Sequence, residues 1–481
     1  MKKILFVGSE VMPYAATGGL GDVLGSLPEA IKKCDDNFDV RVMMPLYGVI
    51  EEKYRREMKF IKSISVSLAW RNLYCGIFEL RKNGVVYYFL DNEYYFKRAG
   101  LYGDFDDGEK FAFFCAAVLK VMPHINFFPD ILHAHDWQSA LSIIYLNMKY
   151  KQIEEYKNIR TIFTIHNIQY QGQYDFAILG DVFDLGPDAR EYVDYNGCIN
   201  LMKGAVILCD YISTVSPQYA KEITQAEHSH DLHHILGPCH EKIHGILNGI
   251  DYDYYDPSKD EDLYVNYTWR SPGKKGANKE KLQEYLHLPV RKDVPLMSVI
   301  SRLVSHKGID LIKNVLEDII ANSDVQFIVL GTGDMDYENY FRYLQGKYDS
   351  KVRAIIAYDR ALSKKIYASS DIFIMPSKSE PCGLSQMIAS RYGAVPVVRE
   401  TGGLYDSIKG YYEDSEGVLH GNGFTFRNYY AYELKDRIYA ALGLYKDREK
   451  WEKFVKTVMR KDFSWDMSAK KYIEMYNDLV I

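Results

Sequence analysis

The sequence predicts two α/β domains, each a doubly wound, Rossmann-like parallel sheet with helices on both faces. Short runs of β-branched and apolar residues alternate with longer stretches of helical periodicity, which indicates βαβ units. Many of the short runs are continuously apolar, which is typical of parallel strands buried on both faces. The chain has 481 residues, and a single hydrophobic core stops growing at roughly 250–300 residues, so we expect two domains.

The predicted strands fall into two series. In the first half of the chain we expect strands at residues 3–7, 39–44, 131–133 and 161–164. In the second half we expect them at residues 296–300, 326–330, 351–356, 372–375 and 394–398. Ligands of such sheets bind beyond the carboxyl ends of the strands. We therefore expect the two sheets to face each other across a cleft, with the functional motifs at strand ends.

A turn dipeptide marks the predicted domain boundary. Asn248-Gly249 follows the strand-like Ile246-Leu247, and a polar stretch comes after it. We expect an N-terminal domain over residues 1–248, a C-terminal domain over 249–460 and a final helix over 461–481.

Composition excludes several classes of protein. The chain is 47% hydrophobic and 26% charged with a net charge of −6, and it lacks the basic stripe of a nucleic-acid binder. Its first apolar run spans four residues, too short for a signal peptide, and no run is long enough to cross a membrane. Seven scattered cysteines without a CxxC predict a reduced, cytoplasmic protein. Nothing in the sequence indicates an oligomeric state.

The first motif is Thr17-Gly18-Gly19-Leu20-Gly21-Asp22, between the first predicted strand and an apolar helix. Glycines let backbone amides approach a phosphate, and a helix N-terminus favours negative charge. An anion site and a plain helix-starting turn both fit this pattern. A dinucleotide site fits poorly, because Leu24 stands where the third glycine of GxGxxG belongs and no ribose-binding acid ends the second strand.

Three further motifs follow predicted strands of the second half. Arg302 and Lys307 follow the strand at 296–300, where two cations can grip a diphosphate. Glu380 lies just before a predicted helix N-terminus, where a carboxylate can bind sugar hydroxyls or simply cap the helix. Thr401-Gly402-Gly403-Leu404 repeats the glycine-rich turn of the first half.

Histidines gather in two places. His133 and His135 alternate along one strand and so point opposite ways, which favours packed side chains over a metal grip. Asp136 and His166 lie at strand ends and are the better candidates for function. Residues 228–244 hold six histidines, but their spacing matches no zinc motif, so we predict no metal site.

Taken in order, these motifs resemble bacterial glycogen synthases and plant starch synthases over nearly the whole chain. The matching segments also include His135-Asp136-Trp137, Thr164-Ile165-His166-Asn167, Gly331-Thr332-Gly333-Asp334 and Asp462-Phe463-Ser464-Trp465. The family implies the GT-B glycosyltransferase architecture, with an acceptor-side first domain and a second domain that binds the nucleotide sugar. It also implies that the last helix, after Trp465, returns to the first domain.

The resemblance implies extension of an α-1,4-glucan at its non-reducing end. The donor is ADP-glucose, the acceptor is glycogen or a maltooligosaccharide, the anomeric configuration is retained, and no metal or other cofactor takes part. Five residues are then expected to be catalytic: His166, Asp136, Arg302, Lys307 and Glu380. The expected substrate-binding residues are Thr17, Gly18, Gly19, Asp22, Asn248, Tyr358, Cys382, Gly383, Leu384, Ser385, Thr401, Gly402 and Gly403.

The resemblance also implies particular roles. Arg302 and Lys307 hold the diphosphate, and backbone amides of both halves, including those of Gly18 and Gly19, contribute to donor binding. Glu380 contacts the donor glucose and Tyr358 stacks on the adenine. Gly403 also contacts the donor glucose, and the amides of Leu384 and Ser385 contribute to donor binding. His166 lies near the reacting carbon, with Asp136 and Asn248 beside it.

One departure from the family concerns the residue before Thr17. The family has lysine there, aimed at the donor, whereas this chain has Ala16. Loss of such a charged hydrogen bond costs roughly 1.5–3 kcal/mol, or about 10- to 100-fold in rate or affinity. A second, minor departure is Gly21, where alanine is common.

Other functions stay open at this point. Ala16 suits a glucan-binding or regulatory homologue with reduced transfer activity. Another retaining transferase of the same architecture, sucrose synthase-like or trehalose-forming, is a further alternative, and the broken GxGxxG argues against a nicotinamide dehydrogenase.

Overall fold

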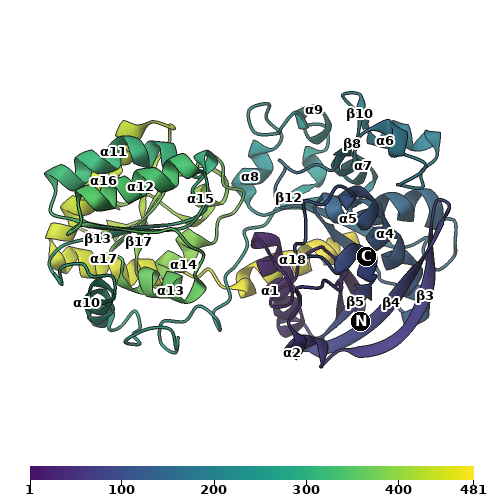
Figure 1. The fold of residues 1–481 in the computed structure, drawn as a ribbon, viewed down its shortest axis with the longest axis horizontal. Coiled ribbons are helices and arrows are strands. Elements are labelled where there is room, and N and C mark those ends of the chain that lie inside the picture. The colour runs from purple at the N-terminus through teal and green to yellow at the C-terminus, as the bar shows by residue number, and fades with distance from the viewer. Residues whose placement is uncertain (481) are drawn as a thin grey trace. The chain divides into compact units, whose positions relative to one another are not determined.

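The computed structural model describes residues 1–480, which form two compact units (Figure 1). Unit 1 comprises Met1–Gly249 together with the chain from Trp465 onward, and unit 2 comprises Ile250–Ser464. Each unit is a central sheet covered by helices, so the predicted pair of doubly wound α/β domains is confirmed.

The sheet of unit 1 has nine strands in the order β12-β11-β7-β6-β1-β2-β5-β4-β3. Neighbours from β12 to β5 pair in parallel, whereas β4 pairs antiparallel with both β5 and β3. The parallel strands are β1 (Lys2–Val7), β2 (Phe38–Pro45), β5 (Val85–Asp91), β6 (Ile131–His135), β7 (Arg160–Ile165), β11 (Tyr211–Thr214) and β12 (Ile243–Gly245). The antiparallel strands are β3 (Lys59–Leu68) and β4 (Arg71–Lys82). A separate small sheet contains β8 (Gln173–Tyr174), β9 (Asp194–Tyr195) and β10 (Cys198–Asn200).

The first long helix of unit 1 buries one apolar face beside β2. In α1 (Gly19–Cys34), Leu20, Val23, Leu24, Leu27 and Ile31 are buried at helical spacing, and Lys32 and Lys33 in the last turn suit the helix dipole. The other helices are α2 (Glu52–Arg55), α3 (Glu93–Phe96), α4 (Asp107–Val121), α5 (Trp137–Tyr145), α6 (Arg190–Val193), α7 (Leu201–Leu208), α8 (Pro217–Glu222), α9 (His233–Leu236) and α18 (Trp465–Leu479).

The helix α18 belongs to unit 1 although it lies at the far end of the sequence. It packs beside α1, as the yellow and purple ribbons of Figure 1 show. The Tyr476 hydroxyl lies 2.8 Å from Nδ1 of His133 in β6, and the Ser468 hydroxyl donates to the carbonyl of Leu247. The core of unit 1 therefore uses residues from both ends of the chain.

The sheet of unit 2 is parallel, with six strands in the order β15-β14-β13-β16-β17-β20. These are β13 (Leu296–Ile300), β14 (Gln326–Leu330), β15 (Val352–Ile355), β16 (Ile372–Met375), β17 (Val395–Arg399) and β20 (Phe424–Phe426). A small hairpin joins β18 (Tyr412–Glu413) to β19 (Leu419–His420). The helices are α10 (Lys275–Tyr285), α11 (Ile309–Asn322), α12 (Met335–Lys347), α13 (Arg360–Ser369), α14 (Ser385–Arg391), α15 (Gly402–Ser407), α16 (Ala431–Lys446) and α17 (Arg448–Arg460).

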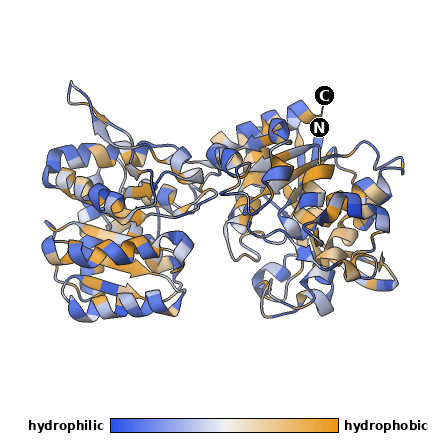
Figure 2. Cartoon of the chain, turned by 90° about the horizontal axis from the view of Figure 1, so that it is seen from above, coloured by the Kyte–Doolittle hydropathy of each residue, from blue (hydrophilic) through white to orange (hydrophobic). Residues whose placement is uncertain are grey.

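Burial explains this layering. Strands β13, β14 and β16 are almost wholly buried, and Figure 2 shows apolar strands between helices whose outer faces are hydrophilic. Within residues 1–480, no helix is both long and apolar enough to span a bilayer.

Candidate active site

Three neighbouring strands of unit 1 carry its candidate residues. The glycine-rich turn follows β1, Asp136 follows β6 and His166 follows β7, and these strands are adjacent in the order β7-β6-β1. Their carboxyl ends therefore bring the three motifs to one edge of the sheet.

The glycine-rich turn is held by Glu10, which sequence reasoning did not single out. Its buried carboxylate accepts hydrogen bonds from the Thr17 amide at 2.6 Å, the Thr17 hydroxyl at 2.7 Å, the Gly18 amide at 3.1 Å and the Tyr102 hydroxyl at 2.7 Å. The Gly18 amide is thus already used inside the protein. An acid directly after the first strand is the sequence signal for this role.

The two glycines of this turn are exposed, and a Cβ added to Gly18 or Gly19 would meet nothing within 4 Å. The Gly19 amide has no acceptor within residues 1–480, because it opens α1. The adjoining position is tighter, since a Cβ on Gly21 would lie 2.3 Å from the Ala16 Cβ. The two departures from the family pattern therefore contact each other.

Asp136 has an unusual backbone. Its φ of 55° and ψ of 178° lie in a region that side chains other than glycine rarely adopt, at a typical cost of roughly 1–3 kcal/mol. Its carboxylate accepts a hydrogen bond of 2.8 Å from the His166 amide. Burial raises the pKa of Asp136 to about 7, with a smaller contribution from the nearby charge of Glu10, while the His166 and Asn167 amides oppose the shift.

His166 is nearly buried, and burial lowers its pKa to about 3, so its ring is neutral at physiological pH. Asn248, beyond β12, has a buried side-chain oxygen without a hydrogen-bond partner within residues 1–480. Such a buried oxygen of Asn248 is suited to receive a hydrogen bond from a ligand. Asp22 lies in the first turn of α1.

In unit 2, adjacent strand ends bring Lys307 and Glu380 together. Lys307 follows β13 and Glu380 follows β16, and their charged groups lie 2.6 Å apart. The Ser377 hydroxyl also donates to the Glu380 carboxylate, at 3.1 Å. Gly308 permits this approach, because a Cβ there would lie 2.1 Å from the Pro376 carbonyl oxygen.

The second glycine-rich turn packs against the loop that carries Glu380. The Gly403 amide donates to the carbonyls of Glu380 and Pro381, both at 3.1 Å. A Cβ on Gly402 would lie 2.0 Å from the Glu380 carbonyl oxygen, and one on Gly403 2.1 Å from that of Cys382. These contacts bring the two loops together at the ends of β16 and β17.

The other predicted residues of unit 2 lie along the same edge. Gly383 has a φ of 70°, and the buried Cys382 precedes it. Leu384 is the N-cap of α14, Ser385 is its first residue, and buried Thr401 is the N-cap of α15.

Two predicted residues of unit 2 are exposed. The Arg302 side chain makes no ion pair or hydrogen bond within the described chain. Tyr358, beyond β15, is 79% exposed, and the Arg360 Nε donates to its hydroxyl at 2.7 Å. A free guanidinium and an exposed aromatic face suit a phosphate and a base, respectively.

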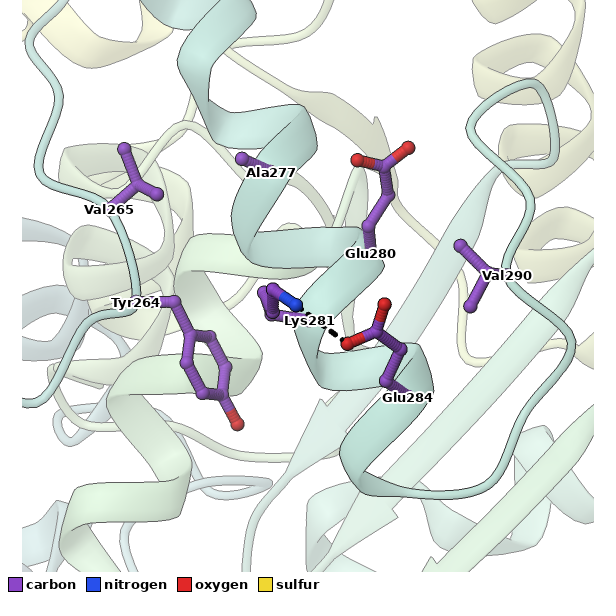
Figure 3. Close-up of a pocket in the computed structure, with 7 residues that line it drawn as sticks. All are labelled: Tyr264, Val265, Ala277, Glu280, Lys281, Glu284 and Val290. Carbon is purple, nitrogen blue, oxygen red and sulfur yellow. Dashed lines mark hydrogen bonds and ion pairs between the residues drawn. The ribbon is translucent and has the colours of Figure 1, made fainter.

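A cavity in unit 2 lies apart from the predicted site residues. A cavity of about 470 Å³ beside α10 is lined by Tyr264, Val265, Ala277, Glu280, Lys281, Glu284 and Val290, none of them a predicted site residue (Figure 3). Among residues 1–480, no group of three or more His, Cys, Asp or Glu side chains is arranged to hold a metal ion.

Comparisons with known proteins agree with this arrangement. Residues 3–237 match the starch synthase catalytic domain family, and residues 287–458 match the glycosyl transferases group 1 family. The glycogen synthase of Desulforamulus reducens is 46% identical over 480 residues, and that of Clostridioides difficile 44% over 486 residues. Each alignment covers 99% of both chains.

Solved structures show the same fold. The catalytic domain of starch synthase IV from Arabidopsis thaliana, bound to ADP and acarbose, superposes with a TM-score of 0.90 at 33% identity, covering 100% of this chain and 99% of that one. Sucrose-phosphate synthase from Thermosynechococcus elongatus, with a TM-score of 0.61 at 15% identity and coverage of 100% and 99%, shares the fold alone. With GT-B architecture and full-length similarity to these enzymes, the chain belongs to the bacterial glycogen synthase family, whose members transfer glucose to glycogen.

Proposed function

We propose that this enzyme transfers glucose from ADP-glucose to the non-reducing end of an α-1,4-glucan with retention of configuration. Glycogen or a maltooligosaccharide is the acceptor, and no metal or other cofactor takes part. The observation that carries the proposal is the cluster at the ends of β13 and β16. There the Lys307–Glu380 ion pair lies on the same sheet edge as Arg302, whose guanidinium has no hydrogen-bond or ion-pair partner among residues 1–480.

This cluster suits a nucleoside diphosphate sugar. A lysine and an arginine can bind the diphosphate and stabilise the negative charge that develops on the leaving group. Glu380, held by the Lys307 ammonium at 2.6 Å, is poised to accept hydrogen bonds from glucose hydroxyls. Tyr358 offers an exposed ring for the base. The ADP bound to the Arabidopsis starch synthase supports adenine as that base.

The residues of unit 1 suit the glucosyl group and the acceptor. The bond from the anomeric carbon to the diphosphate breaks, and its electron pair leaves with ADP. The acceptor O4 attacks the same face of the sugar, and its proton passes to the departing phosphate oxygen. Neutral His166, Asp136 and Asn248 would surround the reacting carbon, and the Asp136 carboxylate would stabilise positive charge on the sugar ring.

A second candidate function rests on Ala16, a methyl side chain in a turn where the resemblance places a cation. The chain would then be a glucan-binding or regulatory homologue with reduced transfer.

Radiolabel transfer from ADP-glucose to glycogen tests both proposals, with UDP-glucose as the competing donor. We expect transfer from ADP-glucose in the parent protein and at least a tenfold gain in Ala16→Lys, the size of one charged hydrogen bond. Preference for UDP-glucose would contradict the proposed donor. Glycogen binding without transfer in the parent, with transfer appearing in Ala16→Lys, would favour the second function.

We also propose a cytoplasmic location. All seven cysteines are free, which supports a reducing compartment. Fractionation of the source cells with an antibody against the chain would test this, and recovery outside the cytoplasmic fraction would contradict it.

A further inference from the structure

Three buried histidine rings form a contiguous cluster at the carboxyl ends of β6 and β7 in unit 1. The rings of His133 and His135 are stacked with centroids 4.3 Å apart, and His135 lies 5.2 Å from His166. The Phe6 ring packs against His133 at 5.1 Å and His135 at 5.6 Å. Burial keeps all three rings neutral, because it lowers the pKa of each.

The rings of this cluster differ in how many of their nitrogens have hydrogen-bond partners. Both nitrogens of His133 have partners: Nδ1 lies 2.8 Å from the Tyr476 hydroxyl, and Nε2 lies 2.6 Å from that of Thr164. In the His135 ring, Nδ1 lies 2.9 Å from Nε2 of His166. The Nε2 of His135 is buried without a partner within residues 1–480.

The unpartnered nitrogen determines where the protons lie. In a pair of neutral imidazoles, one ring donates and the other accepts. If His166 donated, His135 would carry its own proton on Nε2 and bury an N–H group without an acceptor, which is rare in folded proteins. If His135 donates from Nδ1, only a lone pair is buried, and the proton of His166 lies on Nδ1.

We infer that His135 is a positioning residue that holds His166 as a neutral hydrogen-bond donor through Nδ1. Two consecutive residues thus fix His166 in different ways: Asp136 holds its backbone amide at 2.8 Å, and His135 holds its ring at 2.9 Å. Within the proposed function, on which this role rests, His166 donates its Nδ1 proton to a hydroxyl oxygen of the donor glucose. It does not act as a proton acceptor.

Three variants separate positioning from packing. His135→Leu removes the bond to His166, whereas His135→Asn keeps an amide donor near the position of Nδ1. Tyr476→Phe is the matched control, because it removes the hydrogen bond to His133 in the same cluster but leaves the His135–His166 pair intact.

We expect His135→Leu to lower kcat by about 30-fold with little change in KM, which is the cost of one hydrogen bond made in the transition state. His135→Asn should recover to within about threefold of the parent, and Tyr476→Phe should stay within about twofold. Equal losses in all three variants would show packing alone and overturn the inference.

The tautomer is measured directly by ¹⁵N NMR of histidine-labelled protein without substrate, with His166 assigned from the spectrum of His166→Gln. We expect a protonated Nδ1 and a bare Nε2 on His166, and loss of that fixed tautomer in His135→Leu. A bare Nδ1 would overturn the inference whatever the transfer assay shows. The expected tautomer in a protein that transfers no glucose from ADP-glucose would contradict the proposed function while supporting the His135–His166 pair.

Discussion

The two units repeat one sequence, Thr-Gly-Gly-Leu, at residues 17–20 and 401–404, and use its glycines for different reasons. In unit 2 both glycines are buried, Gly402 has a φ of 44°, and added Cβ atoms would overlap neighbouring carbonyl oxygens. In unit 1 both are exposed with open space around them, and the Glu10 carboxylate holds the turn. Packing thus requires glycine in unit 2, whereas in unit 1 the glycines border open space, which suits the donor site proposed above.

The largest effect is expected from Gly403→Ala. The new Cβ would lie 2.1 Å from the Cys382 carbonyl oxygen, and such overpacking against backbone costs about 3 kcal/mol. Urea unfolding followed by circular dichroism should show this loss in unit 2. Gly443→Ala is the control, because that glycine of α16 has nothing within 4 Å and alanine should stabilise the helix by about 0.5–1 kcal/mol. Similar behaviour of the two variants would refute a packing role for Gly403.

The next effect concerns Glu10, whose hydrogen bonds hold the glycine-rich turn of unit 1. In unit 2 the close packing of the glycines holds the corresponding turn. Glu10→Gln places an amide group against N–H donors, and we expect a loss of about 2 kcal/mol in the free energy of unfolding. The exposed Glu51, paired with Lys53 at the surface, serves as the control, with a Glu51→Gln change below about 0.5 kcal/mol. Thermal unfolding of both variants is the measurement, and equal stability would mean that the turn does not depend on Glu10.

The units also differ in which residue has a positive φ after a strand, Gly402 in unit 2 and Asp136 in unit 1. The third test concerns Asp136, because its carboxyl group titrates and glycine has none. Because burial raises the pKa of Asp136 to about 7, the folded protein binds this proton more tightly than the unfolded chain. The stabilisation is complete below the unfolded pKa near 4 and is lost as pH rises through about 7. Asp136→Asn does not titrate, so its stability relative to the parent should rise by about 1–2 kcal/mol between pH 6 and pH 8. A pH-independent difference in urea titrations would argue against the raised pKa.

The smallest change in stability is expected from Gly19→Ala. Its Cβ meets nothing in the protein, so the free energy of unfolding should stay within about 0.5 kcal/mol of the parent or rise slightly. Transfer should nevertheless fall by about tenfold in kcat/KM, because the methyl group occupies the space left for the donor. Unchanged kinetics would show that no ligand approaches this turn.

The sequence predicted the central strands of unit 2 best. The strands β13, β14 and β16 have the predicted bounds, because their continuous apolar runs end sharply at turn residues. Sequence analysis missed the buried parallel strands β5, β11 and β20. It also missed β3 and β4, which pair antiparallel at the sheet edge and expose much of their surface. Such strands carry a weaker hydrophobic pattern, so periodicity separates them poorly from loops.

The motifs at strand ends were readable because parallel sheets collect them at one edge. Their pairwise contacts were not, since Lys307 and Glu380 are 73 residues apart and Tyr102 and Glu10 are 92 apart. Those contacts depend on strand order and loop geometry. His133 and His135 are packed histidines, as predicted. The expectation that they point opposite ways was wrong, because residues two apart on a strand share one face, and their rings stack 4.3 Å apart. Among residues 1–480, both ring nitrogens of His133 have partners, whereas Nε2 of His135 has none.

The position of α18 has a consequence for how the chain is made. Unit 1 lacks this helix, and the Tyr476 partner of His133, until the ribosome has synthesised the whole of unit 2. At about 5–20 residues per second, that delay is on the order of 10–40 s. During this time the face of α1 that α18 covers stays accessible to chaperones, while unit 2 can complete its own sheet. Nascent chains stalled before Trp465 should therefore expose an incomplete first unit beside a finished second one.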